Sequence, residues 1–156
     1  MDSARGLANH CLYMARLQLV AWQDRLAQAE TPQAALNAAF APAVRLHLLD
    51  AYGWFLLASC RASQLPDTPP HSTHDMPAAP AGIGQSDAIA HCKLLEADRN
   101  SWLAQLRAPI PPGLGQIRRS DNLAMAGYYP DQAMMVEAHA ALADLIEQWD
   151  DSVDEC

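Results

Sequence analysis

Apolar residues recur at spacings of three and four along most of this 156-residue chain, and this period is the feature that most limits its fold. A helix has about 3.6 residues per turn, so such spacing places apolar side chains on one face. The chain is also rich in Ala and Leu and contains only two Phe, a mixture that favours helices over strands. The sequence therefore predicts an all-α fold. Its clearest helical face carries Met135, Ala138, Leu142, Leu145, Trp149 and Val153.

Four helices are expected, at about residues 3–29, 31–63, 86–106 and 130–153. Proline cannot donate a backbone hydrogen bond, so Pro42 is expected to kink the second helix or to divide it. In the third helix we favour a break at Asn100-Ser101, with Ser101 as a new N-cap, because a continuous helix would place Arg99 on the apolar face. These helices predict a four-helix, up-and-down-like bundle with a long proline-rich connection between the second and third helices, and with residues 1–156 as a single domain.

Residues 65–85 interrupt the helical pattern with five prolines. Their fixed φ angle and missing N–H exclude a helix interior or a central strand. A connection of this length is usually either functional or disordered, and we predict a flexible linker. The segment includes His71, His74 and Asp75, whose side chains are of types that bind transition metals, but we expect a solvated polar stretch here. The five prolines are Pro66, Pro69, Pro70, Pro77 and Pro80.

Charge and hydropathy limit the possible partners. The formal net charge is −8, from 18 acidic and 10 basic residues, and Lys93 is the single lysine. Proteins that bind nucleic acid rely on clustered cations, so nucleic acid is not an expected partner. No apolar block approaches the roughly 20 residues that a membrane-spanning helix needs. The first residues do not resemble a signal peptide, so we expect a cytoplasmic protein with reduced cysteines and no membrane partner.

No residue pattern predicts a catalytic centre, a cofactor or a metal site. Di-iron bundles use Glu-x-x-His on two helices, whereas Glu137 and His139 are only two positions apart. The cysteines fall within helical patterns and are expected to be inert. Enzymatic activity is therefore left open, with a non-catalytic role preferred.

Two charged residues lie among apolar neighbours in the expected helices, namely Arg16 in the first and Asp50 in the second. A lone buried charge costs several kcal/mol. If both side chains face inward, we expect them to form a buried ion pair that sets the register of the two helices.

Three short blocks are similar in order and spacing to motifs of a known family. They are Leu12-Tyr13-Met14-Ala15-Arg16-Leu17, Arg45-Leu46-His47-Leu48 and Asn100-Ser101-Trp102-Leu103-Ala104-Gln105-Leu106. The resemblance is to an uncharacterised family of small bacterial all-helical proteins, a domain of unknown function. It implies a helical protein of bacterial type. The family has no assigned catalytic residues, so the resemblance implies no site, and the proline-rich stretch is not part of its pattern.

The second helix is apolar on nearly all sides, which is typical either of the central helix of a bundle or of a subunit interface. Exposed apolar surface on soluble proteins often binds a partner. We therefore predict an interaction or accessory protein that binds a protein partner or associates with itself. The predicted contact residues are Trp54, Phe55 and Leu56, followed by Tyr128 and Tyr129. The alternative is a small-molecule-binding bundle whose apolar pocket is lined by Met14, Trp22, Tyr52 and Trp54.

Overall fold

The computed structural model of the chain describes residues 3–78, 85–112 and 130–150. Within these ranges the chain forms five α-helices, one 3₁₀ turn and no strand, which confirms the all-α prediction. The elements are α1 (Ala4–Gln28), α2 (Gln33–Ser59), η1 (Thr73–Asp75), α3 (Asp87–Ala97), α4 (Trp102–Arg107) and α5 (Gln132–Asp150).

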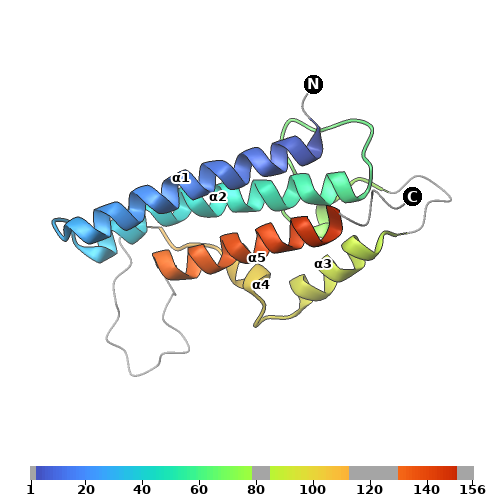
Figure 1. Ribbon diagram of the computed structural model, residues 1–156. Coiled ribbons are helices and arrows are strands. Elements are labelled where there is room, and N and C mark those ends of the chain that lie inside the picture. The colour runs from blue at the N-terminus through green and yellow to red at the C-terminus, as the bar shows by residue number, and fades with distance from the viewer. Residues whose placement is uncertain (1–2, 79–84, 113–129, 151–156) are drawn as a thin grey trace.

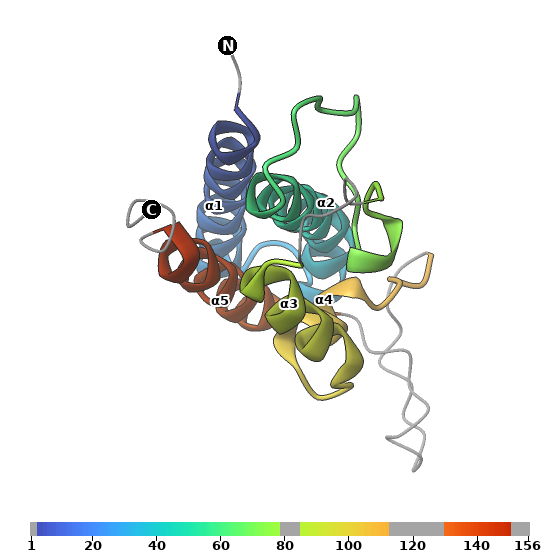
Figure 2. The same ribbon diagram turned by 90° about the vertical axis from the view of Figure 1, so that its right-hand side faces the viewer.

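The two longest helices, α1 and α2, form an antiparallel hairpin, and α5 runs along it in the direction opposite to α1 (Figure 1). The short helices α3 and α4 lie on the side of α2 and α5 that is away from α1 (Figure 2). Helix α2 contacts α1, α3, α4 and α5. It is therefore the central helix, which explains why its sequence is apolar on nearly all sides.

The helices begin and end where the sequence offers capping groups. The Ser3 side chain accepts a hydrogen bond from the Gly6 N–H at the start of α1, and the Ser86 side chain accepts one from the Ile89 N–H at the start of α3. At the end of α1, Ala29 adopts a left-handed conformation with φ of 54°. The chain therefore turns into α2 within a few residues.

The expected break in the third helical region is confirmed. Helix α3 ends at Ala97 and α4 begins at Trp102, where the Ser101 side chain accepts a hydrogen bond of 3.0 Å from the Ala104 N–H. Because this region supplies two short helices instead of one long one, the four-helix up-and-down arrangement is not confirmed. Helix α2 continues through Pro42, which is exposed, and is not divided there.

One hydrophobic core joins residues from all five α-helices. In the α1–α2 hairpin, Trp22 stacks on Phe40, with ring centroids 5.7 Å apart and planes 9° from parallel. Among the described helices, none combines the length and the apolar character needed to cross a bilayer. The largest fully buried side chains are Trp22, Tyr52, Leu48, Leu56, Leu57, Leu103, Leu106, Met135, Leu142, Val44 and Cys92.

Candidate functional site

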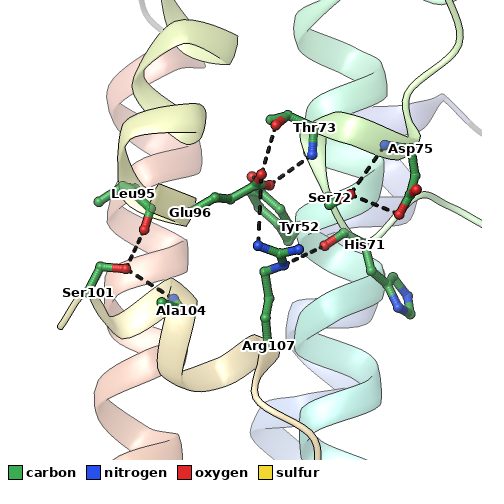
Figure 3. Close-up of polar contacts among 10 residues, drawn as sticks. All are labelled: Tyr52, His71, Ser72, Thr73, Asp75, Leu95, Glu96, Ser101, Ala104 and Arg107. Atoms are coloured by element: carbon green, nitrogen blue, oxygen red, sulfur yellow. Dashed lines mark hydrogen bonds and ion pairs between the residues drawn. The ribbon is translucent and has the colours of Figure 1, made fainter. Parts of the chain in front are cut away.

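The Glu96 carboxylate, near the end of α3, contacts polar groups from three other segments (Figure 3). The Tyr52 hydroxyl of α2 donates to Glu96 Oε1 at 2.7 Å. Thr73 of η1 donates twice, from its backbone N–H to Oε1 and from its hydroxyl to Oε2, both at 2.8 Å. Arg107 Nη1 of α4 lies 3.9 Å from Oε2. The Glu96 side chain is only 11% exposed, so these contacts form in a largely water-excluded setting.

The same contacts hold part of the proline-rich segment against the helices. Arg107 Nε donates to the His71 carbonyl at 3.1 Å, and His71 Nε2 lies 2.7 Å from Asp50 Oδ1 of α2. Ser72 is buried, and its hydroxyl hydrogen-bonds the Asp75 carboxylate at 2.8 Å. Residues 71–73 are thus held against the bundle, in contrast to the solvated stretch that their composition suggested, whereas His74 and Asp75 are exposed. The interhelical contacts that hold residues 71–73 cannot be seen in local composition.

Gly53 allows this close approach. It is a buried residue in the interior of α2, where glycine costs about 1 kcal/mol relative to alanine. A Cβ atom at position 53 would overlap the carbonyl oxygen of Pro70 and lie 2.8 Å from Pro69 Cβ. Only a residue without a side chain lets the prolines pack directly on the helix.

The hydrogen bonds and pKa shifts in this cluster are typical of a structural role. Burial raises the pKa of the Tyr52 hydroxyl, and the neighbouring Cys92 and Glu96 add to that rise. Burial also raises the pKa of Cys92 to about 11, so its thiol is protonated at neutral pH. The Glu96 oxygens already accept three hydrogen bonds within the chain. A role as general base would require these bonds to break first.

The pKa values of the other two described cysteines are also raised. Burial is the main cause that raises the pKa of Cys11, with the Asp50 charge adding to it, and burial also raises the pKa of Cys60. A nucleophilic cysteine needs a lowered pKa, because the thiolate is the reactive form. These directions disfavour cysteine chemistry at positions 11, 60 and 92.

A cavity of about 570 Å³ lies between α2, the end of α4 and the start of α5. Arg45 of α2 projects to this end of α4, where its guanidinium donates to the Leu106 and Arg107 carbonyls at 3.0 and 2.8 Å. These bonds satisfy carbonyls that the short helix leaves without partners. The lining combines charged and apolar side chains: Arg45, Gln105, Leu106, Ala108, Pro109, Ile110, Pro130, Asp131, Ala133, Met134, Met135 and Glu137.

The outward side of α1 carries a row of large apolar side chains. Tyr13, Leu17 and Val20 are 54%, 48% and 54% exposed, and their spacing of four and three places them on successive turns. We call these three residues the α1 outer stripe. Single exposed apolar residues are ordinary, but a contiguous row is typical of a surface that another molecule covers. The opposite side of the helix is in the core through Ala8, Ala15, Leu19 and Trp22.

The predicted partner-binding residues do not form an exposed surface. Trp54, Phe55 and Leu56 are 8%, 5% and 0% exposed, because α2 is covered by its neighbouring helices and by the packed proline-rich segment. Tyr128 and Tyr129 lie outside the described residues.

The predicted Arg16–Asp50 ion pair does not form. Arg16 is exposed on α1, whereas Asp50 lies beside His71. The prediction assumed that both side chains face inward, but Arg16 is exposed. The partner of Asp50 is His71 of the proline-rich segment, and not a residue of α1.

The apolar pocket predicted from Met14, Trp22, Tyr52 and Trp54 involves residues of the core. Trp22 and Tyr52 are fully buried, and the cavity lies instead around Arg45. His139 donates from Nε2 to the Leu12 carbonyl at 3.1 Å, so it joins α5 to α1. Within the described ranges, no group of three His, Cys, Asp or Glu side chains is placed to hold a metal ion.

Sequence reasoning missed both Glu96 and the α1 outer stripe. The stripe had a usable signal, since positions 13, 17 and 20 follow helical spacing on the side of α1 away from Ala8, Ala15 and Trp22. Glu96 had none, because its partners Tyr52 and Thr73 are 44 and 23 positions away in the chain.

Comparison of the chain with protein-family models, with curated proteins and with solved structures finds no match. The resemblance of the three helical blocks to an uncharacterised bacterial family therefore stays a prediction.

Proposed function

We propose that this protein is a non-catalytic interaction protein that binds another polypeptide through the α1 outer stripe. The observation that carries the proposal is the exposure of three large apolar side chains on successive turns of one helix. Amphipathic helices normally place polar residues at such positions. Here Tyr13, Leu17 and Val20 occupy the face that α2 and α5 leave uncovered.

Covering these residues contributes favourable free energy to binding. Full burial of a large apolar side chain is worth about 1.5–3 kcal/mol, and these side chains are each about half exposed. Covering all three would therefore contribute about 3 kcal/mol. A polar rim beside such a centre is the usual composition of a protein interface, and Arg16, Gln23 and Asp24 are exposed on the same helix.

The polar chemistry of the described residues supports a binding role over a catalytic one. The Glu96 carboxylate is engaged within the chain, and the pKa values of Cys11, Cys60 and Cys92 are raised. None of these groups is prepared as a base or a nucleophile at neutral pH.

The test compares two charge insertions on exposed helix positions. Leu17→Glu places a carboxylate in the centre of the α1 outer stripe, and Leu94→Glu makes the same change on α3, where Leu94 is 71% exposed. We expect affinity capture of binding partners from a bacterial lysate to fail with Leu17→Glu and to proceed with Leu94→Glu, with both variants folded by circular dichroism. A partner that both variants capture equally would exclude the α1 outer stripe as the binding surface.

A second function is favoured by the cavity around Arg45. Its volume of about 570 Å³ lies within the range of about 300–1,000 Å³ that small-molecule sites occupy. The cavity also combines a few polar groups with apolar walls, which suits a ligand that has one charged end. In this function, Arg45 would orient the ligand, and Met134 and Ile110 would contact its apolar part.

This second function is tested by filling the cavity. Ala133→Trp adds an indole to the lining, whereas Ala90→Trp adds one to an exposed position of α3 outside the cavity. A metabolite that raises the melting temperature of the wild type and of Ala90→Trp, but not of Ala133→Trp, would establish the site. A library that shifts none of the three proteins would remove this alternative.

A further inference from the structure

We infer that the polypeptide that covers the α1 outer stripe is helix α5 of a second copy of this chain. The inference rests on the proposed function, since it names the partner of the same surface. It is carried by the charges of α1 and α5, by the sizes of their exposed apolar residues, and by their adjacent positions in the bundle.

The two helices have opposite charges. Helix α1 contains Arg5, Arg16 and Arg25 against the single acid Asp24, although the whole chain has a net charge of −8. Helix α5 contains four acidic residues and neither Lys nor Arg. A basic helix is thus present in an acidic protein, and a second copy supplies the acidic helix that complements it.

The acidic side chains of α5 stand where extra positive charge would stabilise them. Asp144 and Glu147 are exposed, and neither forms an ion pair among the described residues. Glu147 lies in the last turn of α5, where the helix dipole disfavours negative charge, and Asp144 lies about one turn before it. Arginines of a docked α1 would offset this unfavourable placement.

The exposed apolar residues of the two helices differ in size in a complementary way. On α5, Val136 and Ala140 precede Asp144 and Glu147 at helical spacing on the solvent-exposed side, and we call these four residues the α5 outer face. Its apolar part is small, whereas the α1 outer stripe is bulky. Large side chains of one helix pack between small side chains of another, as at ordinary helix–helix contacts.

The position of the two helices allows the contact to form twice. Helices α1 and α5 lie next to each other, joined by the hydrogen bond from His139 to the Leu12 carbonyl, and they run in opposite directions (Figures 1 and 2). A twofold axis parallel to the helices places α1 of each copy on α5 of the other. The interface is then closed, so association stops at a dimer.

The twofold symmetry also increases the buried interface area beyond what one helix face provides. A stable interface buries about 800 Å² per partner. Helix α1, with 25 residues, is about 37 Å long, and α5, with 19 residues, is about 28 Å long. Two such contacts, related by the twofold axis, double the surface that a single docked helix would bury.

The experiment is sedimentation velocity of the purified full chain from low to high micromolar concentration. We expect a species of twice 17.0 kDa, whose dissociation constant rises with ionic strength because the contact includes opposite charges. Leu17→Glu and Arg16→Glu should each weaken dimerisation by roughly tenfold or more, and Leu94→Glu should leave it unchanged. Adding Asp144→Lys and Glu147→Lys to Arg16→Glu should restore the dimer.

The outcomes separate this inference from the proposed function. A monomer at every concentration overturns self-association, and so do assemblies that keep growing beyond the dimer or a dimer that Leu17→Glu does not weaken. If the chain is monomeric, a photo-crosslinker at position 17 that captures a different polypeptide leaves the proposed function in place. If the crosslinker captures no polypeptide at that position, both the dimer inference and the proposed function are wrong.

Discussion

Helices α1 and α2 are similar in length, with 25 and 27 residues, and both carry apolar side chains on more than one side, yet their surroundings differ. Four other helices and the prolines at positions 69 and 70 cover most of α2, so Trp54, Phe55 and Leu56 are buried, although Leu46 is 52% exposed. Helix α1 packs mainly on α2 and α5, which leaves Tyr13, Leu17 and Val20 exposed. An apolar pattern around a helix therefore indicates that several of its faces are buried in the functional state. Only the tertiary structure shows which of these faces are buried within the chain.

The sharpest test of this comparison removes a leucine from each helix. Leu56 is fully buried in α2, so Leu56→Ala should lower the free energy of unfolding by about 2–5 kcal/mol. Leu17→Ala on the exposed side of α1 should change the stability of the monomer by no more than about 0.5 kcal/mol. Urea unfolding of the two variants at low protein concentration measures both effects. Equal losses at the two positions would contradict the distinction between a covered and an uncovered helix face.

The next effect concerns how the proline-rich segment covers α2. Gly53→Ala adds a methyl group that overlaps the Pro70 carbonyl, so we expect it to destabilise the fold by about 1–3 kcal/mol in spite of the better helix propensity of alanine. Gly6→Ala in α1 meets only the flexible Ser3 side chain, at 3.3 Å, and should cost less. Thermal unfolding gives both values. A stabilising Gly53→Ala would mean that the prolines do not pack on α2.

A smaller effect should be seen at alkaline pH, where α2 meets α3. Burial raises the pKa of Cys92 from 9.0 to about 11, so the folded state holds a proton that the unfolded chain loses first. The contribution of Cys92 to stability is complete below about pH 9 and declines by up to about 2 kcal/mol as the pH rises towards 11. Urea unfolding at several pH values should show this decline in the wild type and a smaller one in Cys92→Ala. Identical slopes would show that the thiol is not buried as described.

The sequence was sufficient for local features and insufficient for contacts between distant segments. The all-α class and the break before Trp102 follow from residues close in the chain, such as the Ser101 cap. The Glu96 cluster does not, because a single carboxylate has no periodicity and its partners come from three other elements. The choice between a central helix and an interface for α2 also depended on its neighbours. Composition also predicted that the proline-rich segment is solvated. The sequence alone does not show that Gly53 gives Pro69 and Pro70 room to pack on α2.

The central claim is that another polypeptide covers the α1 outer stripe, and site-specific photo-crosslinking in cells tests it most directly. A photo-reactive residue replaces Leu17 in one protein and Leu94, the more exposed leucine of α3, in another. The account predicts a discrete crosslinked product from position 17, at the mass of two chains if the partner is a second copy, and none from position 94. Absence of a product at position 17, or the same product at both positions, would contradict it.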